Sequence, residues 1–593
     1  MRVRVTRSGV RHSTLMAVRL PPWVLLCIAA AGWLACGGDD VSPDPSLLGG
    51  PGVPVHSRSG VVVSGSRLAT SVGVNVLEQG GNAVDAAVAT AFALAVVEPS
   101  MSGIGGRTQL VLRTADGVIA AIDGTTEVPV AYSGGPVDDE SAYGWSTIAV
   151  PGTVAALAHA LRAHGSWPLA RIIEPAIRLA GDGFLLPEAE AVRIAGAAER
   201  LREFDGSRSA FLRPDGSAYG FGELLVQPDL ATTLRAIAEN GEDAFYRGPI
   251  AERMAEDIAA HGGLVTAADL TAYRAEESIV VRGSYRGHEL VGSYLPASGA
   301  TTIEILQILD HVDLSRVTGS ADWISLVAQA LLIGFEDREA DVATPAEKAV
   351  WLTSRELAAE RAGTLRLPPA TALMSTRSRP MVDVAPAVVR RDRPLSLVHV
   401  QPGATDISEP AHTTHVSVAD RWGGVVALTQ SVGPVMGSKV TTPGLGFLYA
   451  ATMGYLGELE PGTRRHWSSQ SPLLVLRDGR PVLAIGGAGA RRIISAVVET
   501  VSRFIDEGLP IDEALAAPRF HPTPSRIDVE VRPGAAWSEA ELERLRTLGF
   551  TVRTRDDAPY FARVNVAGWN ATASVWTGVA DPRWAGAAAA FAR

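Results

Sequence analysis

Two short runs of alternating apolar residues follow directly on a long irregular segment of this sequence. Residues 366–412 are rich in Pro and show neither a helical nor a strand period. After them, apolar side chains lie on both sides of a Trp-Gly-Gly turn, at Val416, Val418, Val425, Val426 and Leu428. This pattern predicts a β-hairpin. An irregular stretch of such length inside a compact chain indicates a functional loop or a segment that is cut.

The register of this hairpin brings two hydroxyl groups together. If its turn centres on Trp422, Val416 faces Leu428 and Thr413 faces Ser431. A Thr whose chain is cut before it has a free α-amine, with an ordinary pKa of about 7.7–8.0, which can serve as base for its own hydroxyl. Thr413 is therefore a candidate nucleophile. The alternative is a Thr-rich strand start with no catalytic role.

The composition favours a compact enzyme over a disordered or nucleic-acid-binding protein. The 593 residues are 47% hydrophobic, which is enough to bury one large core or two ordinary ones. The formal net charge of −11 argues against a nucleic-acid partner.

Strand-like runs and helical stretches alternate along the chain, which predicts an α/β fold. Strand patterns fall at residues 61–65, 279–292, 473–477 and 482–486, and helices are expected at 67–79, 82–97, 300–310, 321–345 and 492–507. Residues 150–275 are predicted to be mostly helical.

The first 35 residues resemble an export signal. Arg residues precede an apolar run at residues 23–35, which is too short to span a bilayer as a mature helix. Cys36 follows Leu34 and Ala35 as in bacterial lipoproteins, so we expect Cys36 to be lipidated and the protein to be anchored in the cell envelope, in the periplasm or at the outer membrane. A plain secretory signal is the alternative. Residues 36–57 are predicted to be a flexible tether.

The two cysteines and the missing motifs exclude several kinds of chemistry. Cys27 and Cys36 are the only cysteines, so the mature chain has no intrachain disulfide and no cysteine nucleophile. The patterns of serine hydrolases, zinc proteases, P-loops and dinucleotide-binding folds are absent, and the 12 His are scattered. We expect no metal and no cofactor.

From about residue 60 to its end the chain resembles the γ-glutamyltranspeptidases, or glutathione hydrolases, of the N-terminal-nucleophile (Ntn) hydrolase superfamily. The matching blocks occur in order at residues 80–87 (GGNAVDAA), 98–106 (EPSMSGIGG), 150–152 (VPG), 174–177 (EPAI), 228–230 (PDL), 243–248 (DAFYRG) and 517–521 (APRFH).

The resemblance implies a four-layer αββα sandwich formed from a self-cleaved precursor. Cleavage between His412 and Thr413 would give a large subunit, residues 58–412, and a small subunit, residues 413–593. Thr413 would attack first the preceding carbonyl and then the substrate amide. Ser431 falls where the family has an assisting hydroxyl. Gly489 and Ala490 fall where two glycines offer N–H groups to the oxyanion, if the backbone at Ala490 allows it.

Substrate recognition departs from the family pattern. Ser468 and Ser469 keep a Ser-Ser pair that binds the γ-glutamyl carboxylate, whereas Thr125 replaces the family's Arg and Gly433 replaces an Asn. The acidic cluster after residue 448 is replaced by a segment that includes Thr452 and Tyr455. Losing two charge-assisted contacts of about 1.5–3 kcal/mol each would weaken γ-glutamyl binding several-hundred-fold.

Three arginines are candidates to replace the missing cation. Arg107 stands where the family has Gly, and Arg465 and Arg491 lie near other matched positions. The alternative is that these side chains are solvated or paired with surface acids.

The first functional hypothesis is a γ-glutamyltransferase or glutathione hydrolase that hydrolyses γ-glutamyl amides such as glutathione, or transfers their acyl group. One alternative is an acylase of the same fold that acts on other amides. Another is a catalytically silent envelope binding protein. The partners implied are a small amide substrate, the two subunits of one precursor, and a membrane reached only through the lipid.

Overall fold

A computed structural model describes residues 48–133, 143–294, 296–317, 319–340, 342, 344–366, 413–455, 464–465 and 468–591. The predictions that concern the export signal, Cys36 and His412 fall on residues outside these ranges.

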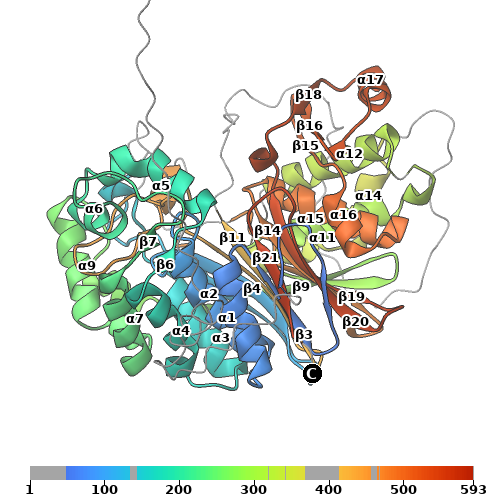
Figure 1. The fold of residues 1–593 in the computed structure, drawn as a ribbon. Coiled ribbons are helices and arrows are strands. Elements are labelled where there is room, and N and C mark those ends of the chain that lie inside the picture. Colours follow the sequence, from blue (N-terminus) through green and yellow to red (C-terminus); the bar gives the residue numbers. More distant parts are fainter. Residues whose placement is uncertain are drawn as a thin grey trace, which may run out of the picture. The chain divides into compact units, whose positions relative to one another are not determined.

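Two antiparallel sheets lie face to face between two layers of helices (Figure 1). The first sheet has the order β1 (Leu48–Gly49), β21 (Ala587–Ala590), β3 (Gly60–Ser64), β11 (Thr414–Asp420), β12 (Val425–Ser431), β4 (Arg107–Arg113), β5 (Ile119–Gly124), β8 (Glu276–Glu277). The second has the order β2 (Val55–Ser57), β20 (Val575–Ala580), β19 (Arg563–Asn570), β14 (Arg480–Ala488), β13 (Leu473–Arg477), β10 (His288–Tyr294), β9 (Ile279–Tyr285).

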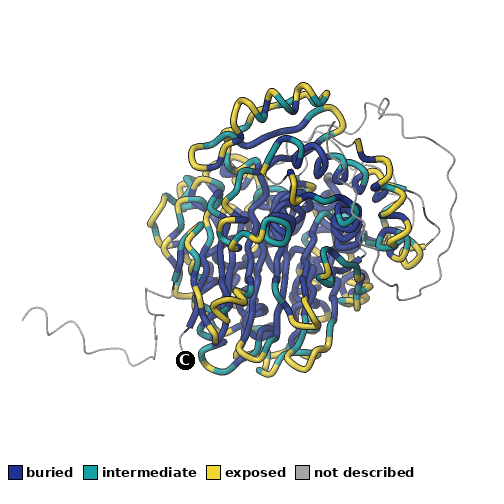
Figure 2. The backbone as a smooth tube through the Cα atoms, turned by 90° about the vertical axis from the view of Figure 1, so that its right-hand side faces the viewer, coloured by how far each residue is buried: buried dark blue, intermediate teal, exposed yellow. Residues whose placement is uncertain are grey.

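The alternation of side chains along each strand separates three buried layers. Val416 and Val418 of β11 pack against helices on the outer face of the first sheet. Ala419 faces the other way and packs with Leu474 and Ala484 of the second sheet. The central strands of both sheets are buried (Figure 2), whereas the edge strands β8 and β9 are partly exposed. The predicted αββα sandwich is confirmed.

Ten helices of the described chain pack on the side of the first sheet. They are α1 (Arg67–Glu78), α2 (Ala83–Val97), α3 (Thr153–His164), α4 (Leu169–Gly181), α5 (Glu188–Leu201), α6 (Asp205–Phe211), α7 (Pro228–Asn240), α8 (Asp243–Tyr246), α9 (Pro249–Ala260) and α10 (Ala267–Ala272). Asn82 caps the N-terminus of α2, because its side chain accepts hydrogen bonds from the N–H groups of Val84 and Asp85. Every residue of α2 is buried, which suits its Ala-rich sequence.

The helices on the side of the second sheet come from two distant parts of the chain. They are α11 (Gly299–Asp310), α12 (Ala321–Arg338), α13 (Pro345–Leu352), α14 (Arg355–Ala362), α15 (Arg492–Ser502), α16 (Ile511–Ala516) and α17 (Glu539–Thr547). A small sheet of β15 (Phe520–Thr523), β16 (Arg526–Arg532), β17 (Ala535–Ala536) and β18 (Val552–Arg555) adjoins them, and β6 (Phe184–Leu185) pairs with β7 (Leu224–Leu225) elsewhere.

Two predicted helices end earlier than the sequence pattern suggested. The helix expected at residues 321–345 stops at Arg338, and a new helix begins at Pro345 because Thr344 caps it. The helix expected at 492–507 is α-helical only to Ser502 and continues as a π turn over Arg503–Glu507. In the part of the chain that the structure describes, no helix is both long and apolar enough to cross a lipid bilayer.

The predicted flexible tether was wrong for its last ten residues. Leu48 and Gly49 pair with Ala589 and Ala588, and β2 pairs with β20. Backbone pairing to strands near the C-terminus orders this segment although its composition is rich in Pro and Gly.

Candidate active site

The β11–β12 hairpin has the register that the sequence predicted. Val416 pairs with Leu428, and Thr414 with Gln430 is the last pair before the open end. Just beyond it, the Thr413 hydroxyl donates a hydrogen bond to Ser431 Oγ over 3.2 Å. Ser431 Oγ also accepts the N–H of Gly433 at 2.9 Å. Both hydroxyl side chains are buried.

Neighbouring strands bring further predicted residues to this end of the first sheet. Arg107 lies opposite Ser431 in the β12–β4 register. Thr108 lies opposite Gly124, so Thr125 leaves β5 at the same level. The sheet therefore brings Thr413, Ser431, Arg107 and Thr125 to the same end of four neighbouring strands.

His415 lies two residues after Thr413 on β11, and its hydrogen bonds define its tautomer. The hydroxyl of Ser417 donates to the Asn565 carbonyl at 3.0 Å, so His415 must donate its Nε2–H to Ser417 Oγ, 3.0 Å away. His415 Nδ1 then accepts the hydroxyl of Thr429 at 2.7 Å. Burial lowers the pKa of His415 to about 3, and the positive charge of Arg563 contributes.

Each buried histidine should lower the stability of the protein in mild acid, against an opposing gain from Glu499, whose pKa burial raises to about 8. Burial likewise lowers the pKa of His521 to about 3, helped by Arg492. Between pH 6.5 and 3 these histidines are protonated in the unfolded chain and neutral in the folded chain. The free energy of unfolding therefore falls as the pH falls through this window. At pH 5 each histidine should cost about 2 kcal/mol. Urea unfolding at pH 7 and pH 5, compared between the wild type and a variant of one histidine, isolates the loss that this histidine causes.

Replacing His521 by Gln should remove the share of His521, about 2 kcal/mol between pH 7 and pH 5. His261→Gln is the matched control, because the His261 side chain is half exposed. An equal effect of both substitutions would contradict the assignment to buried histidines.

Gly489 and Ala490 form a sharp turn between β14 and α15. Their φ angles are +146° and +53°. Gly489 lies against Ala562, where an added Cβ would come within 2.8 Å of the Ala562 Cα. The next residue, Arg563, contacts Thr413, so the turn lies close to the hairpin end. The N–H groups of Gly489 and Ala490 donate no hydrogen bond to another described residue. An oxyanion site requires such donors, because they must bind the substrate oxygen. Ala490 thus adopts a left-handed backbone, and the role of its N–H at the oxyanion stays a prediction.

Ser468 and Ser469 lie between α11 and the hairpin. The Ser468 N–H donates to the Pro296 carbonyl at 2.6 Å, and the side chain of Gln470 donates to the Thr429 carbonyl at 3.3 Å. The Arg338 guanidinium at the end of α12 reaches Ser469 Oγ at 3.3 Å. This arginine was not predicted from the sequence.

The region that differs from the family pattern is held mainly by hydroxyl and backbone groups. The hydroxyls of Thr126 and Thr452 lie 2.8 Å apart. The Thr125 N–H donates to Asp123, and its carbonyl accepts the Tyr273 hydroxyl. The Ala451 N–H donates to the Val432 carbonyl beside Ser431, which brings this segment to the hairpin end. Tyr455 ends the short helix Thr452–Tyr455.

The three candidate cations differ in their surroundings. The guanidinium of Arg465 binds Asp123 at 2.6 Å and Glu127 at 2.7 Å, with its side chain 9% exposed. Arg491 pairs with Glu339 at the surface. Arg107 is buried beside Ser431. Acids of the protein therefore already engage Arg465 and Arg491. Arg491 pairs with a surface acid, as the alternative interpretation expected, whereas the acids that bind Arg465 are buried.

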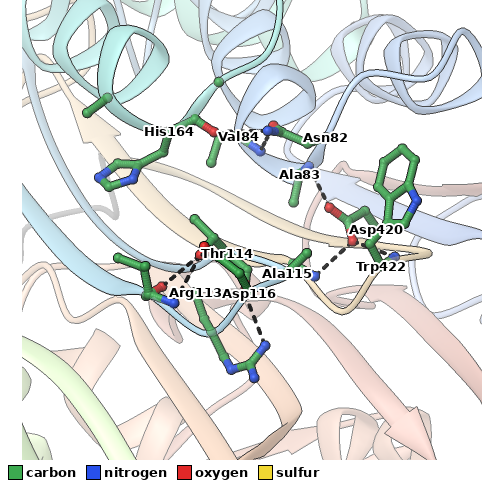
Figure 3. Close-up of a pocket in the computed structure, with 14 residues that line it drawn as sticks. Asn82, Ala83, Val84, Arg113, Thr114, Ala115, Asp116, His164, Asp420 and Trp422 are labelled. Atoms are coloured by element: carbon green, nitrogen blue, oxygen red, sulfur yellow. Dashed lines mark hydrogen bonds between the residues drawn. The ribbon is translucent and has the colours of Figure 1, made fainter.

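A separate cavity of about 520 Å³ lies at the turn end of the hairpin (Figure 3). Asn82, His164, Asp420 and Trp422 line it. The Asp420 carboxylate there accepts the N–H groups of Ala83, Trp422 and Gly424. Because β11 separates this cavity from Thr413, it is not part of the candidate active site. No three His, Cys, Asp or Glu side chains in the described ranges are arranged to hold a metal ion.

Comparisons with known proteins agree with this arrangement. The family described as Gamma-glutamyltranspeptidase matches residues 69–591. The glutathione hydrolase proenzyme of Escherichia coli K12 is 34% identical over 535 residues, covering 85% of this chain and 87% of that protein. The acylase ACY 1 proenzyme of Pseudomonas sp. SE83 is 33% identical, covering 83% and 87%.

A solved structure shares the fold over nearly the whole chain. The cephalosporin acylase of Bacillus halodurans superposes with a TM-score of 0.77 over 94% of this chain and 99% of the other, at 24% identity. Together with the sequence matches, this shows that the chain is an Ntn-type enzyme that belongs to the γ-glutamyltranspeptidase family.

Proposed function

We propose that the protein is a self-processing amidohydrolase or acyltransferase whose nucleophile is Thr413. The observation that carries this proposal is the hydrogen-bonded pair of Thr413 and Ser431 at the open end of the hairpin. In processing, Thr413 Oγ attacks the carbonyl carbon of His412, and the resulting ester is hydrolysed. This leaves a carboxylate on His412 and a free α-amine on Thr413.

The same hydroxyl then attacks the substrate amide. The α-amine takes the proton of Thr413 Oγ and passes it to the departing amine, while the N–H groups of Gly489 and Ala490 bind the oxyanion. Water or a second amine releases the acyl group from Thr413. Ser431 Oγ, fixed by the Gly433 N–H, keeps the hydroxyl oriented through both steps.

We further propose that the preferred acyl group carries no α-ammonium. Residues 449–455 contain no acid, and Asp123 and Glu127 are bound by Arg465. An ammonium group near Thr452 would therefore lack the carboxylate that the family provides. Arg107 and Arg338 still offer positive charge beside Ser431 and Ser469. Named relatives include an acylase as well as a glutathione hydrolase.

Three p-nitroanilides test the acyl preference of the purified enzyme. The γ-glutamyl and glutaryl anilides differ only in the α-ammonium, and the pentanoyl anilide lacks the carboxylate as well. We expect kcat/KM for the glutaryl anilide to exceed that for the γ-glutamyl anilide by about tenfold or more, the equivalent of one lost charge-assisted contact.

Each other result has a definite meaning. Faster release from the γ-glutamyl anilide would favour the glutathione hydrolase hypothesis. A pentanoyl anilide as good as the glutaryl one would exclude recognition of a carboxylate. No release by a correctly processed protein would favour the silent binding protein.

Export and lipidation at Cys36 are also proposals, supported by the sequence pattern of residues 1–36. Labelled palmitate should enter the wild-type protein in a bacterial host and should not enter Cys36→Ala. Labelling of neither protein would leave the plain secretory signal as the better interpretation.

A further inference from the structure

A buried ion pair lies directly behind the candidate nucleophile. Arg563, at the start of β19, donates from Nη2 to the Thr413 carbonyl at 3.0 Å and from Nη1 to Glu98 Oε1 at 2.7 Å. Arg563 is 1% exposed and Glu98 2%. Three distant parts of the chain thus meet at the backbone of Thr413.

The guanidinium is closer to Thr413 than the carboxylate is, because it lies between the two. The nitrogen of Thr413 lies within about 7 Å of Arg563 Nη2, because the Thr413 carbonyl oxygen is 3.0 Å from Nη2 and N and O of one residue are at most about 3.6 Å apart. The cluster is tightly packed, since a Cβ on Gly65 would come within 2.6 Å of both Glu98 Oε2 and Thr414 Oγ1. Little solvent is therefore available to screen the charge.

We propose that Arg563 is a positioning residue for Thr413, which holds the carbonyl of the nucleophile and favours the uncharged form of the α-amine that processing exposes. This inference rests on the proposed function, because only a processed chain has that amine. The peptide bond that is cut contains the carbonyl of His412. The Thr413 carbonyl is not part of this bond and can keep its hydrogen bond to Arg563 before and after processing.

The physical reason is the repulsion between the guanidinium and a protonated amine. A like charge within 4–6 Å disfavours the charged form and lowers the pKa of an amine. Arg563 already acts in this direction on His415. Burial is the main cause of the lowered pKa of His415, and the charge of Arg563 is the second cause. Glu98 opposes the effect from farther away. The other charged or titratable groups packed around this cluster are Arg107, Glu190, Arg193, His415, Arg519 and Asp581.

Two neutralising substitutions should shift the acid limb of the kcat/KM profile in opposite directions. Arg563→Gln removes the cation, so the α-amine protonates more readily and the limb should move up by about one pH unit. Glu98→Gln leaves the cation uncompensated, so the limb should move down. The acid limb of Arg563→Lys should stay near that of the wild type, because Lys keeps the positive charge. Arg286→Gln is the matched control, since Arg286 forms a partly buried ion pair with Asp506 elsewhere.

The profile is measured with the best of the three anilides, and intact mass is recorded for every variant. If no anilide is turned over, the pH dependence of periodate oxidation of the N-terminal Thr, which needs the free amine, replaces it. Opposite shifts support the inference. Processed variants with an unchanged limb, or shifts of the same sign, would overturn it. A wild-type chain that is not cut before Thr413 would instead overturn the proposed function.

Discussion

Replacing Thr413 by Ala is expected to leave the chain uncut and to lower amide hydrolysis by about 10⁴-fold or more. The hydroxyl is the attacking group in both reactions, and losing a nucleophile in comparable hydrolases costs factors of this size. Intact mass should show one chain in place of a fragment that begins at Thr413. The substitution removes one hydrogen bond to Ser431, so the fold should persist.

Thr413→Ser is the matched control for this prediction. It keeps the hydroxyl and should still be cut, with activity reduced far less than in Thr413→Ala. A Thr413→Ala protein that is cut at the same bond would rule out self-processing by this residue. An uncut but fully active Thr413→Ala protein would rule out Thr413 as the nucleophile.

The hairpin could be predicted because all of its determinants are local. Alternating apolar residues on both sides of a glycine turn fix the face and the register of a strand pair, and the register alone set Thr413 opposite Ser431. The capping of α2 by Asn82 could be predicted for the same reason, since it depends only on residues 82–85.

The contacts behind the hairpin could not be predicted in this way. Arg563 and Glu98 are 465 positions apart, and nothing beside either residue in the sequence indicates the other. Arg465 was a candidate substrate cation because the sequence does not show that Asp123 and Glu127 bind it. Arg338 reaches Ser469 only because α12 ends beside the 468–471 segment. Such pairings follow from the stacking of layers, which local patterns do not specify.

The tether shows the opposite failure, in which composition misled. Residues 48–57 contain the Pro and Gly expected of a linker, yet they pair with β21 and β20. Pro51 and Pro54 lie between the two short strands and therefore interrupt no backbone pairing. A neighbouring strand from the other end of the chain decided the structure of this segment.

Replacing Gly489 by Ala is expected to lower kcat about 10²–10³-fold in a chain that still folds. The φ of +146° is accessible almost only to Gly, and the new Cβ would collide with Ala562 at 2.8 Å. The turn must then move, which takes the N–H groups of Gly489 and Ala490 away from the oxyanion. Removing one such donor costs this much in other hydrolases. Anilide turnover and thermal unfolding, measured on the same samples, separate lost catalysis from lost folding.

Two substitutions at the two ends of β14 serve as controls, because each changes the conformational preference of the backbone without removing an N–H donor. Gly479→Ala lies in the turn at the other end of β14, with φ +73° and no atom within 4 Å of the added Cβ. It should cost about 1 kcal/mol of stability and leave turnover unchanged. Ala490→Gly should relieve the left-handed strain at φ +53° and also keep turnover, because Gly donates the same N–H. Full activity in Gly489→Ala would mean that the oxyanion is bound elsewhere. A loss in Ala490→Gly as large as in Gly489→Ala would mean that the methyl group of Ala490, and not the backbone, shapes the site.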